Sequence, residues 1–382
     1  MGDPDRLRQQ VRDWIADDPD PATRAEAAQL LELAEAGDPE SLASLRDAFD
    51  GRLSFGTAGL RAEQGAGPRR LNRAVVAPTC AGIADYLRRR AEGGVDNSAD
   101  GPPSVVVGFD ARVNSEVFAR DAAEVLAGAG LRVFLFPEPV PTPVTAFAVR
   151  HLGAAAGVMI TASHNPPRDN GLKVYLGGAD GGAQLVPPAD SEIAGRIAEA
   201  ARTPFAGIQR SAEYATLGPE VVDAYVAAAA QGARLPGGGG AGSAAATPDS
   251  PLTVVYTALH GVGAAITRRV LDAAGLPRII PVSEQDLPNG TFPTVASPNP
   301  EEPEALALAY RVASEHRADL VIAHDPDADR LAVAAPCPED SGAYRSLSGN
   351  ELGLLLGWRA AERERRSAER EGRSVRGTLA NT

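Results

Sequence analysis

Residues 104–136 read SVVVGFDARVNSEVFARDAAEVLAGAGLRVFLF. The apolar run Ser104–Phe109 predicts a buried strand, and Leu131–Phe136 predicts a second one. Between them, the Ala-rich stretch Glu116–Gly130 predicts a helix. A strand, a helix and a strand in this order form the unit from which parallel sheets are built. The segment therefore predicts an α/β domain with a largely parallel sheet.

The same alternation continues on both sides of a low-complexity stretch. Gly157–Thr161 predicts a third strand of the first domain. Residues 232–252 are rich in Gly, Ala and Pro, and we interpret them as a flexible surface insertion. Strands at Leu252–Tyr256 and Ala318–Ala323 and a helix at Ala264–Ala274 follow it. We therefore expect a second α/β domain after the insertion.

Helical patterns stand at both ends of the chain. Residues 5–50 are rich in Ala, Leu, Glu and Arg, and the breaks at Asp17-Asp18-Pro19 and Gly37-Asp38-Pro39 divide them into two or three helices. Their expected apolar faces contain Trp14, Ile15, Leu30, Leu31 and Leu33. Residues 358–375 are dense in Arg and Glu and predict a solvated helix, and Leu379–Thr382 resembles the start of a strand.

The composition excludes several classes of protein. The 382 residues carry 37 basic and 50 acidic side chains, a formal net charge of -13, whereas a nucleic-acid partner needs a basic surface. No apolar run approaches the roughly 20 residues of a membrane span, and Met1–Arg6 lack the layout of a signal peptide. Cys80 and Cys337 stand alone, and we interpret them as two buried thiols in a reducing compartment. We expect a cytoplasmic protein that binds neither nucleic acid nor membrane.

Lysine is almost absent from the chain. Lys173 is the only one, so the other 36 of the 37 basic residues are arginines. Because arginine stays protonated, a single retained lysine suggests a task in which a proton is given and taken. An ordinary surface lysine is the alternative, and the composition alone does not decide between the two.

The most specific motif is the fifteen-residue run 161–175, TASHNPPRDNGLKVY. The preceding strand carries Ser163 into a loop at the carboxyl edge of the sheet, where open α/β sheets bind their ligands. A hydroxyl there can carry a phosphoryl group, and His164 and Lys173 add donors near it. Asn170-Gly171 predicts a tight turn between the two halves of the motif. The alternative is a polar turn in which Ser163 only satisfies local backbone groups.

A second motif, DPDADR at residues 325–330, directly follows a predicted strand. In an extended loop, residues two apart point the same way, so Asp325, Asp327 and Asp329 would converge on one hard cation. Magnesium prefers such oxygen ligands and bridges to phosphate, while Arg330 can pair with a phosphate. An acidic surface loop is one alternative, and a calcium-binding EF-hand is another that fails on its spacing.

Three shorter motifs carry weaker signals. In FGTAGLR, Phe55–Arg61, small residues permit close approach of the backbone to a ligand and Arg61 adds a phosphate partner; an ordinary glycine turn is the alternative. We interpret His260–Gly263 as a tight strand-to-helix turn rather than a phosphate site. Asp110 and Arg112 in GFDAR predict a structural ion pair or cap rather than a catalytic pair.

Together these motifs resemble one known family. FGTAGLR, TASHNPPRDNGLKVY and DPDADR, in this order, resemble the α-D-phosphohexomutase superfamily. The N-terminal helices, YTALHGVG at 256–263 and LSGNEL at 347–352 are similar to its phosphoglucomutase/phosphopentomutase branch. The resemblance covers the chain apart from the insertion. It implies four domains around a central cleft, the first three of which are built alike as three-layer α/β/α folds.

The resemblance implies an organisation for the chain. We expect four parts: an N-terminal helical extension at 1–50, domain I with a phosphoserine loop at 51–212, domain II with a metal loop and the insertion 232–252 at 213–338, and an incomplete domain III at 339–382.

The resemblance also implies a role for the serine and the aspartates. Ser163 corresponds to the phosphoserine that donates and recovers the phosphoryl group. Asp325, Asp327 and Asp329 correspond to the aspartates that bind Mg²⁺, with the phosphate on Ser163 as a further ligand. The cofactor implied is Mg²⁺, with a bisphosphorylated sugar as activator and intermediate.

Four further residues are similar to active-site residues of the family. His164 and Lys173 correspond to residues around the transferring phosphate, with Lys173 as a general acid and base. Arg61 and Arg330 correspond to arginines that stabilise this phosphate. The implied activity is a phosphosugar mutase that interconverts a hexose 1-phosphate and a hexose 6-phosphate, with glucose as the first sugar. Its partner is a small sugar phosphate.

The sequence departs from the family in two loops. It has neither a Gly-Glu-x-Ser-Gly-His-type sugar loop nor an Arg-x-Ser-Gly-Thr-type phosphate loop, so we expect a truncated gene product or a fragment. One alternative function is an inactive or merely sugar-phosphate-binding remnant. Another is a phosphatase or mutase whose nucleophile is an aspartate, from Asp325 and Asp327. Hexose or pentose preference, oligomeric state and phosphorylation state stay open.

Overall fold

The structure is a computed structural model of the chain. It describes residues 4–57, 59–94, 101–233, 252–275, 279–338, 340, 342–375 and 377. The expected insertion at 232–252 lies almost entirely outside these residues, and so does the expected strand start at Leu379–Thr382. The chain divides into two compact units, residues 1–221 with 289–291 and residues 222–288 with 292–382. The expected domain boundaries stay predictions.

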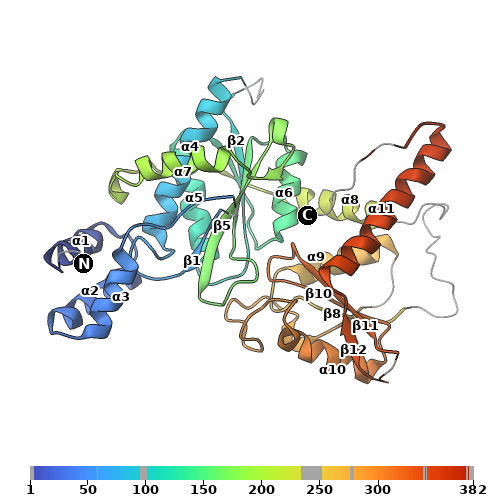
Figure 1. Cartoon of the computed structure of the whole chain (residues 1–382). Coiled ribbons are helices and arrows are strands. Elements are labelled where there is room, and N and C mark those ends of the chain that lie inside the picture. The colour runs from blue at the N-terminus through green and yellow to red at the C-terminus, as the bar shows by residue number, and fades with distance from the viewer. Residues whose placement is uncertain are drawn as a thin grey trace. The chain divides into compact units, whose positions relative to one another are not determined.

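Three helices form the N-terminal part of the first unit (Figure 1): α1 (Pro4–Asp17), α2 (Pro21–Glu35) and α3 (Pro39–Phe49). Asp20 and Asp38 cap α2 and α3, because their carboxylates accept hydrogen bonds from backbone amides of the first turn. A proline follows each cap at the first helical position, where its missing amide donor is not needed. The Asp-Pro pairs that interrupt the helical pattern are therefore helix starts.

The three helices share a small core. Val11 and Leu31 are buried in it, and Trp14 packs edge-on against Phe49, with ring centroids 5.7 Å apart. The expectation for Leu33 is wrong, since 43% of this residue is exposed. It lies two residues from Leu31, and a helix turns about 100° per residue, so the two side chains point to different sides.

The rest of the first unit is built on one mixed sheet, in the strand order β1-β5-β4-β2-β3-β7 with β6 paired to β5. Its strands are β1 (Leu60–Glu63), β2 (Ser104–Phe109), β3 (Arg132–Leu135), β4 (Ala156–Ile160), β5 (Asp169–Leu176), β6 (Ala183–Gln184) and β7 (Ala215–Thr216). The predicted strands β2, β3 and β4 are confirmed and run parallel. β5 runs antiparallel to both of its neighbours, β4 and β1, which the sequence did not predict. Only a short loop joins β4 to β5, and such a loop reaches an antiparallel neighbour.

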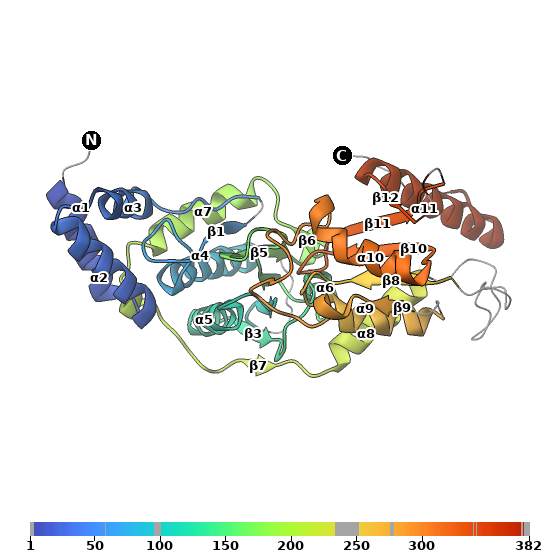
Figure 2. The same ribbon diagram turned by 90° about the horizontal axis from the view of Figure 1, so that it is seen from below.

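Helices cover both faces of this sheet (Figure 1): α4 (Arg73–Glu92), α5 (Ser115–Gly128), α6 (Thr142–His151) and α7 (Ala189–Ala200). On one face, Val105 and Val107 of β2 join one core with side chains of α4 and α5, and α7 lies beside α4 (Figure 2). The other face meets α6, because a Cβ on Gly108 would lie 2.1 Å from the hydroxyl oxygen of Thr145. The expected three-layer α/β/α fold is thus confirmed.

Asn170 and Gly171 lie inside β5, so the prediction of a tight turn there is wrong. Gly171 stands opposite Arg61 of β1. A Cβ on this glycine would lie 2.1 Å from the carbonyl oxygen of Leu60. The glycine therefore permits two strands to approach closely, and Asn170 is buried and donates to the hydroxyl of Ser115.

Gly59 offers a test of this close packing. Its φ is +79°, and a Cβ would lie 2.0 Å from the carbonyl oxygen of Leu172. We expect Gly59→Ala to lower the free energy of unfolding by about 2–4 kcal/mol, because the backbone is strained for any other residue and β1 must move away from β5. Gly56→Ala is the matched control, since nothing lies within 4 Å of its Cβ position. Urea unfolding of both variants measures the difference, and equal losses would contradict this account.

The second unit contains a five-stranded sheet in the order β12-β11-β10-β8-β9. Its strands are β8 (Val254–Thr257), β9 (Ile279–Pro281), β10 (Leu320–His324), β11 (Leu331–Pro336) and β12 (Tyr344–Ser346). Four helices accompany them: α8 (Glu220–Ala233), α9 (Gly263–Ala274), α10 (Ala307–His316) and α11 (Gly349–Glu371). The predicted strands β8 and β10 and the predicted helix α9 are confirmed. Helix α11 starts before the expected residue 358, at a capping box of Ser348 and Glu351.

The two sheets share a connectivity plan. β2 lies between and parallel to β3 and β4, and β8 lies in the same way between β9 and β10. In each sheet a short loop then leads to an antiparallel strand, β5 or β11. The two candidate loops, residues 161–168 and 325–330, occupy this same connection. The two sheets therefore repeat one unit of parallel strands followed by a loop and an antiparallel strand.

The two cysteines differ in accessibility, so the expectation of two buried thiols is wrong for one of them. Cys80 of α4 is buried and Cys337 is half-buried. Burial raises the pKa of the Cys80 thiol, so almost no thiolate forms there at mildly alkaline pH. We expect iodoacetamide to modify Cys337 but not Cys80 in the folded chain, and both in concentrated guanidinium. Peptide mass spectrometry reads the sites, and early modification of Cys80 would contradict the expectation.

Among the residues that the structure describes, no helix combines the length and the apolar character that crossing a bilayer requires.

Candidate active site

Ser163 lies in the loop that joins β4 to β5 and has an unusual backbone. Its φ is 55°, in the left-handed region, and only 1% of the residue is exposed. Its amide donates to the hydroxyl oxygen of Thr161 at 2.8 Å. A left-handed non-glycine residue is strained and persists only where its surroundings hold it. The conformation at Ser163 is therefore imposed by the domain.

A buried ion pair lies beneath this loop. Asp110 accepts hydrogen bonds from the hydroxyls of Thr161 at 2.7 Å and Ser115 at 2.6 Å. Its Oδ2 lies 3.5 Å from Nε of Arg112, and both side chains are almost fully buried. Burial raises the pKa of the Asp110 carboxyl, while Arg112 and the two hydroxyls oppose this rise. The expected structural ion pair is confirmed.

Arg112 also binds the candidate loop, which the sequence did not predict. Its guanidinium donates to four main-chain carbonyls at 2.6–3.0 Å, those of Ser163, Asn165, Pro166 and Asp169. The only signal in the sequence is the place of GFDAR after a strand, because strands next to each other in a parallel sheet end at the same edge.

The remaining candidates of the first unit lie on the neighbouring strands. β1 brings Arg61 opposite Gly171 of β5. Lys173 of β5 pairs with Met159 of β4 and is 2% exposed, which excludes the alternative of an ordinary surface lysine. Nδ1 of His164 lies 3.5 Å from Oγ of Ser163. The three adjacent strands β1, β5 and β4, with their loop, thus carry all four predicted catalytic residues.

In the second unit, the three aspartates of the DPDADR loop converge. One carboxylate oxygen from each of Asp325, Asp327 and Asp329 lies within 4.8 Å of the others. Asp325 and Asp327 are buried, and Asp329 is exposed. The prediction of an extended loop is wrong, because Ala328 is left-handed with φ 54° and its amide donates to the carbonyl oxygen of Asp325 at 2.9 Å. A tight turn, rather than a two-residue repeat, brings the carboxylates together.

This carboxylate set fits Mg²⁺. Three oxygen donors from carboxylates are the hard ligands that this cation prefers. Two buried carboxylates at this distance repel each other, and a divalent cation between them would remove the repulsion. Arg330 follows the turn, and its amide donates to Oδ1 of Asp325 at 3.0 Å.

The loop after β8 packs against the DPDADR loop and is hydrogen-bonded to it. The amide of Val262 donates to the carbonyl oxygen of Pro326 at 2.8 Å. A Cβ on Gly261 would lie 2.3 Å from the Cα of Pro326, so only glycine fits. Leu259 and His260 have positive φ values of 47° and 61°. The expected tight turn at this position is confirmed, and it supports the aspartates from the side.

A half-buried histidine precedes the aspartates, and the sequence did not predict its role. Nδ1 of His324 lies 3.0 Å from the hydroxyl of Tyr256. Burial lowers the pKa of His324 to about 4, so its ring is neutral near neutral pH. No local pattern distinguishes this histidine, because its partner comes from the neighbouring strand.

Two family models match the chain. One is described as "Phosphoglucomutase/phosphomannomutase, alpha/beta/alpha domain I" and matches residues 52–203; the other, for domain II of the same family, matches residues 237–338. The chain belongs to the phosphoglucomutase/phosphomannomutase family. The domain I match contains the loop of Ser163, and the domain II match contains the loop of Asp325.

The relatives of this family member are named for several different sugar phosphates. A probable phosphomannomutase of Haemophilus influenzae is 47% identical over 292 residues, which are 76% of this chain and 56% of the relative. The phosphopentomutase of Homo sapiens is 37% identical over 94% of this chain and 56% of its own length. A solved structure of a putative phosphomannomutase from Thermus thermophilus matches with a TM-score of 0.60 and 29% identity, over 77% of this chain and 58% of that one. This chain thus spans little more than half the length of the relatives it matches.

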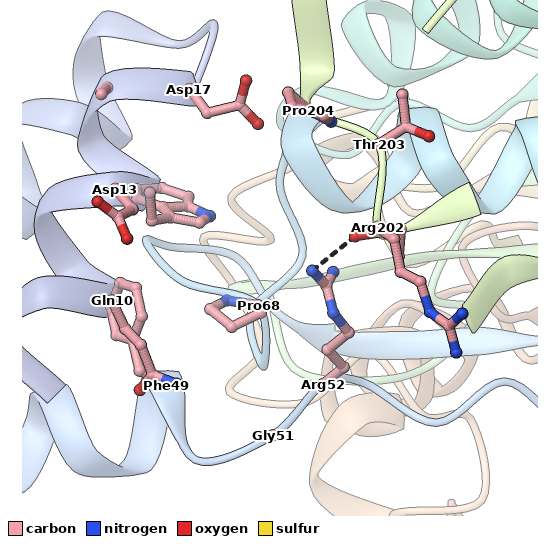
Figure 3. A pocket seen from close by; sticks show the side chains of 13 residues that line it. Gln10, Asp13, Asp17, Phe49, Gly51, Arg52, Pro68, Arg202, Thr203 and Pro204 are labelled. Atoms are coloured by element: carbon pink, nitrogen blue, oxygen red, sulfur yellow. Dashed lines mark hydrogen bonds between the residues drawn. The ribbon is translucent and has the colours of Figure 1, made fainter. Parts of the chain in front are cut away.

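The first unit of this family member also has a pocket of about 680 Å³ (Figure 3). It lies between α1, the end of α3 and residues 201–204. Arg52 lines this pocket and donates to the carbonyl oxygen of Ala201 at 2.9 Å. Asp13 of α1 lies on the side opposite Arg52, and Trp14 is a further lining residue. None of the candidate site residues lines this pocket, so its volume does not mark the place of the proposed chemistry.

Proposed function

We propose that this chain carries out the phosphoryl transfer of a phosphosugar mutase, which interconverts a hexose 1-phosphate and a hexose 6-phosphate. Glucose phosphates are the proposed pair. The observation that carries the proposal is Ser163, a hydroxyl-bearing residue held in a strained backbone at the end of β4. Strain of this kind gathers at functional sites. A serine in that place, within a domain of this family, supports a phosphoserine.

The proposed chemistry has two halves. In the first, the bond between phosphorus and Oγ of Ser163 breaks while a hydroxyl oxygen of the sugar monophosphate bonds to phosphorus. The hydroxyl proton passes to Nζ of Lys173, the proposed general base. The resulting sugar bisphosphate turns round and donates its other phosphoryl group to Oγ, and Lys173 returns the proton to the released sugar oxygen. Such transfers depend mainly on positioning and on neutralisation of charge.

Cationic and donor groups of the chain would provide this neutralisation. We assign Arg61, on the strand next to β5, to the transferring phosphoryl group, and His164 would add a donor beside Oγ. We assign Arg330 to the phosphate of the substrate. Arginine suits these tasks because its fork of donors matches phosphate oxygens and always carries charge.

Asp325, Asp327 and Asp329 would hold Mg²⁺, and we propose the phosphate of Ser163 as a further ligand. Bound Mg²⁺ neutralises negative charge on the phosphoryl group. Its carboxylate ligands belong to the second unit and Ser163 to the first, so the proposal requires the two loops to meet in the working enzyme.

The half-reaction with a bisphosphate tests the proposal and its substrate class. The purified chain is mixed with Mg²⁺ and glucose 1,6-bisphosphate, and intact-mass spectrometry follows the gain of one phosphoryl group. Mannose 1,6-bisphosphate and ribose 1,5-bisphosphate are the comparison donors, because relatives at 47%, 37% and 36% identity are named for mannose, pentose and glucose phosphates. We expect the fastest uptake from the glucose donor. Faster uptake from another donor would refute the assigned sugar, and no uptake from any donor would refute the function.

A further inference from the structure

Arg112 binds the main chain of the loop that carries Ser163 through four hydrogen bonds. Nη2 donates to the carbonyl oxygens of Ser163 at 2.7 Å and Asn165 at 2.6 Å. Nη1 donates to those of Pro166 at 2.8 Å and Asp169 at 3.0 Å. The four hydrogens of the two Nη atoms thus match four carbonyl oxygens. Since the side chain is fully buried, water does not compete for these donors.

Asp110 connects this arginine to the other side of Ser163. Its Oδ1 accepts a hydrogen bond from the amide of Arg112 at 3.0 Å. Its Oδ2 accepts one from the hydroxyl of Thr161 at 2.7 Å, and that hydroxyl oxygen accepts one from the amide of Ser163 at 2.8 Å. The network therefore holds Ser163 by its amide through Thr161 and by its carbonyl through Arg112.

These contacts fix the peptide groups on both sides of Ser163. In a trans peptide, the carbonyl and the following amide point in opposite directions. Because the carbonyl of Ser163 points to Arg112, the amide of His164 points away from it. A φ of 55° is disfavoured for serine, so contacts from outside the loop have to maintain it.

We infer that Arg112 is a positioning residue for phosphoryl transfer. It imposes the left-handed backbone at Ser163 and so sets the direction from which Oγ receives and donates the phosphoryl group. This inference rests on the proposed function of Ser163. Lysine cannot replace this arginine, because one ammonium group with three hydrogens does not span four carbonyl oxygens of residues 163–169.

Phosphoryl uptake by the full chain tests the inference. Its rate is measured against the concentration of glucose 1,6-bisphosphate for the wild type and for Arg112→Lys. We expect the maximal rate to fall about 10²-fold, as displacement of a reacting group by about 1 Å does, with an unchanged half-saturating concentration. Arg73→Lys is the matched control, because Arg73 pairs with the buried Asp121 at 2.7 Å in the same unit without binding the loop. The control should keep the wild-type rate.

Chemical rescue separates positioning from stability. Added guanidinium ion should partly restore uptake in Arg112→Ala, because it can occupy the vacated space. Guanidinium is a denaturant, so it would only slow a variant whose defect is lost stability. Rescue, together with the slow Arg112→Lys, supports the inference.

Three results would overturn it. A wild-type rate in Arg112→Lys refutes positioning and leaves the proposed function intact. A slow Arg112→Lys with an equally lowered melting temperature, and no rescue of Arg112→Ala, assigns the residue to stability alone. No uptake in the wild type refutes the proposed function and this inference with it.

Discussion

A chain with Ser163→Ala is expected to gain no phosphoryl group from glucose 1,6-bisphosphate under conditions in which the wild type is labelled. The loss should be on the order of 10³-fold or more, because the substitution removes the atom that forms the covalent bond. The fold should survive, since the hydrogen bonds of the Ser163 amide and carbonyl are kept in this variant.

Intact-mass spectrometry measures the label, and circular dichroism checks the fold. Ser54→Ala is the control, because Ser54 is an exposed serine of the same unit, close to the FGTAGLR motif. It should be labelled as fast as the wild type. A labelled Ser163→Ala variant would show that another residue accepts the phosphoryl group.

The second large effect concerns the carboxylates of the second unit. Asp327→Asn is expected to remove most of the stabilisation that Mg²⁺ gives the folded chain. In the wild type, Mg²⁺ at about 100 times its dissociation constant should raise the free energy of unfolding by about 2.7 kcal/mol. The variant should lose most of this gain, because one of the three proposed ligands is no longer a carboxylate. The three carboxylates have oxygens within 4.8 Å of one another, and Asp327 is one of the two that are buried.

Chelation should reverse the order of stability of the two proteins. With EDTA, the variant should be more stable than the wild type by about 1–3 kcal/mol, because one of the repelling charges is gone. Urea unfolding with Mg²⁺ and with EDTA gives both numbers. Asp272→Asn, an exposed position on α9, is the control and should behave as the wild type. Equal stabilisation of Asp327→Asn and the wild type by Mg²⁺ would rule out this metal site.

The sequence predicts what depends on local patterns. Buried strands such as Ser104–Phe109 carry an unbroken apolar run, and the helices between them carry their own spacing, so these elements agree with the structure. The DPDADR motif has only six residues. Any compact turn within it brings its three aspartates near one another.

What the sequence missed depends on contacts between distant segments. β5 carries Gly171 in its middle, and only the carbonyl of Leu60 on β1 explains why a glycine stands there. Ala328 gives no sign that it is left-handed, because its neighbours in the fold impose that backbone. Arg112 is one arginine among 36, and its four carbonyl partners lie more than fifty residues away.

One measurement addresses the central claim most directly. The wild-type chain is labelled with glucose 1,6-bisphosphate and Mg²⁺, digested, and mapped by tandem mass spectrometry under conditions that preserve both serine phosphates and acyl phosphates. The account predicts a single phosphoryl group on Ser163. A phosphoryl group on Asp325 or Asp327 instead would contradict it and assign the chain to enzymes with an aspartyl nucleophile.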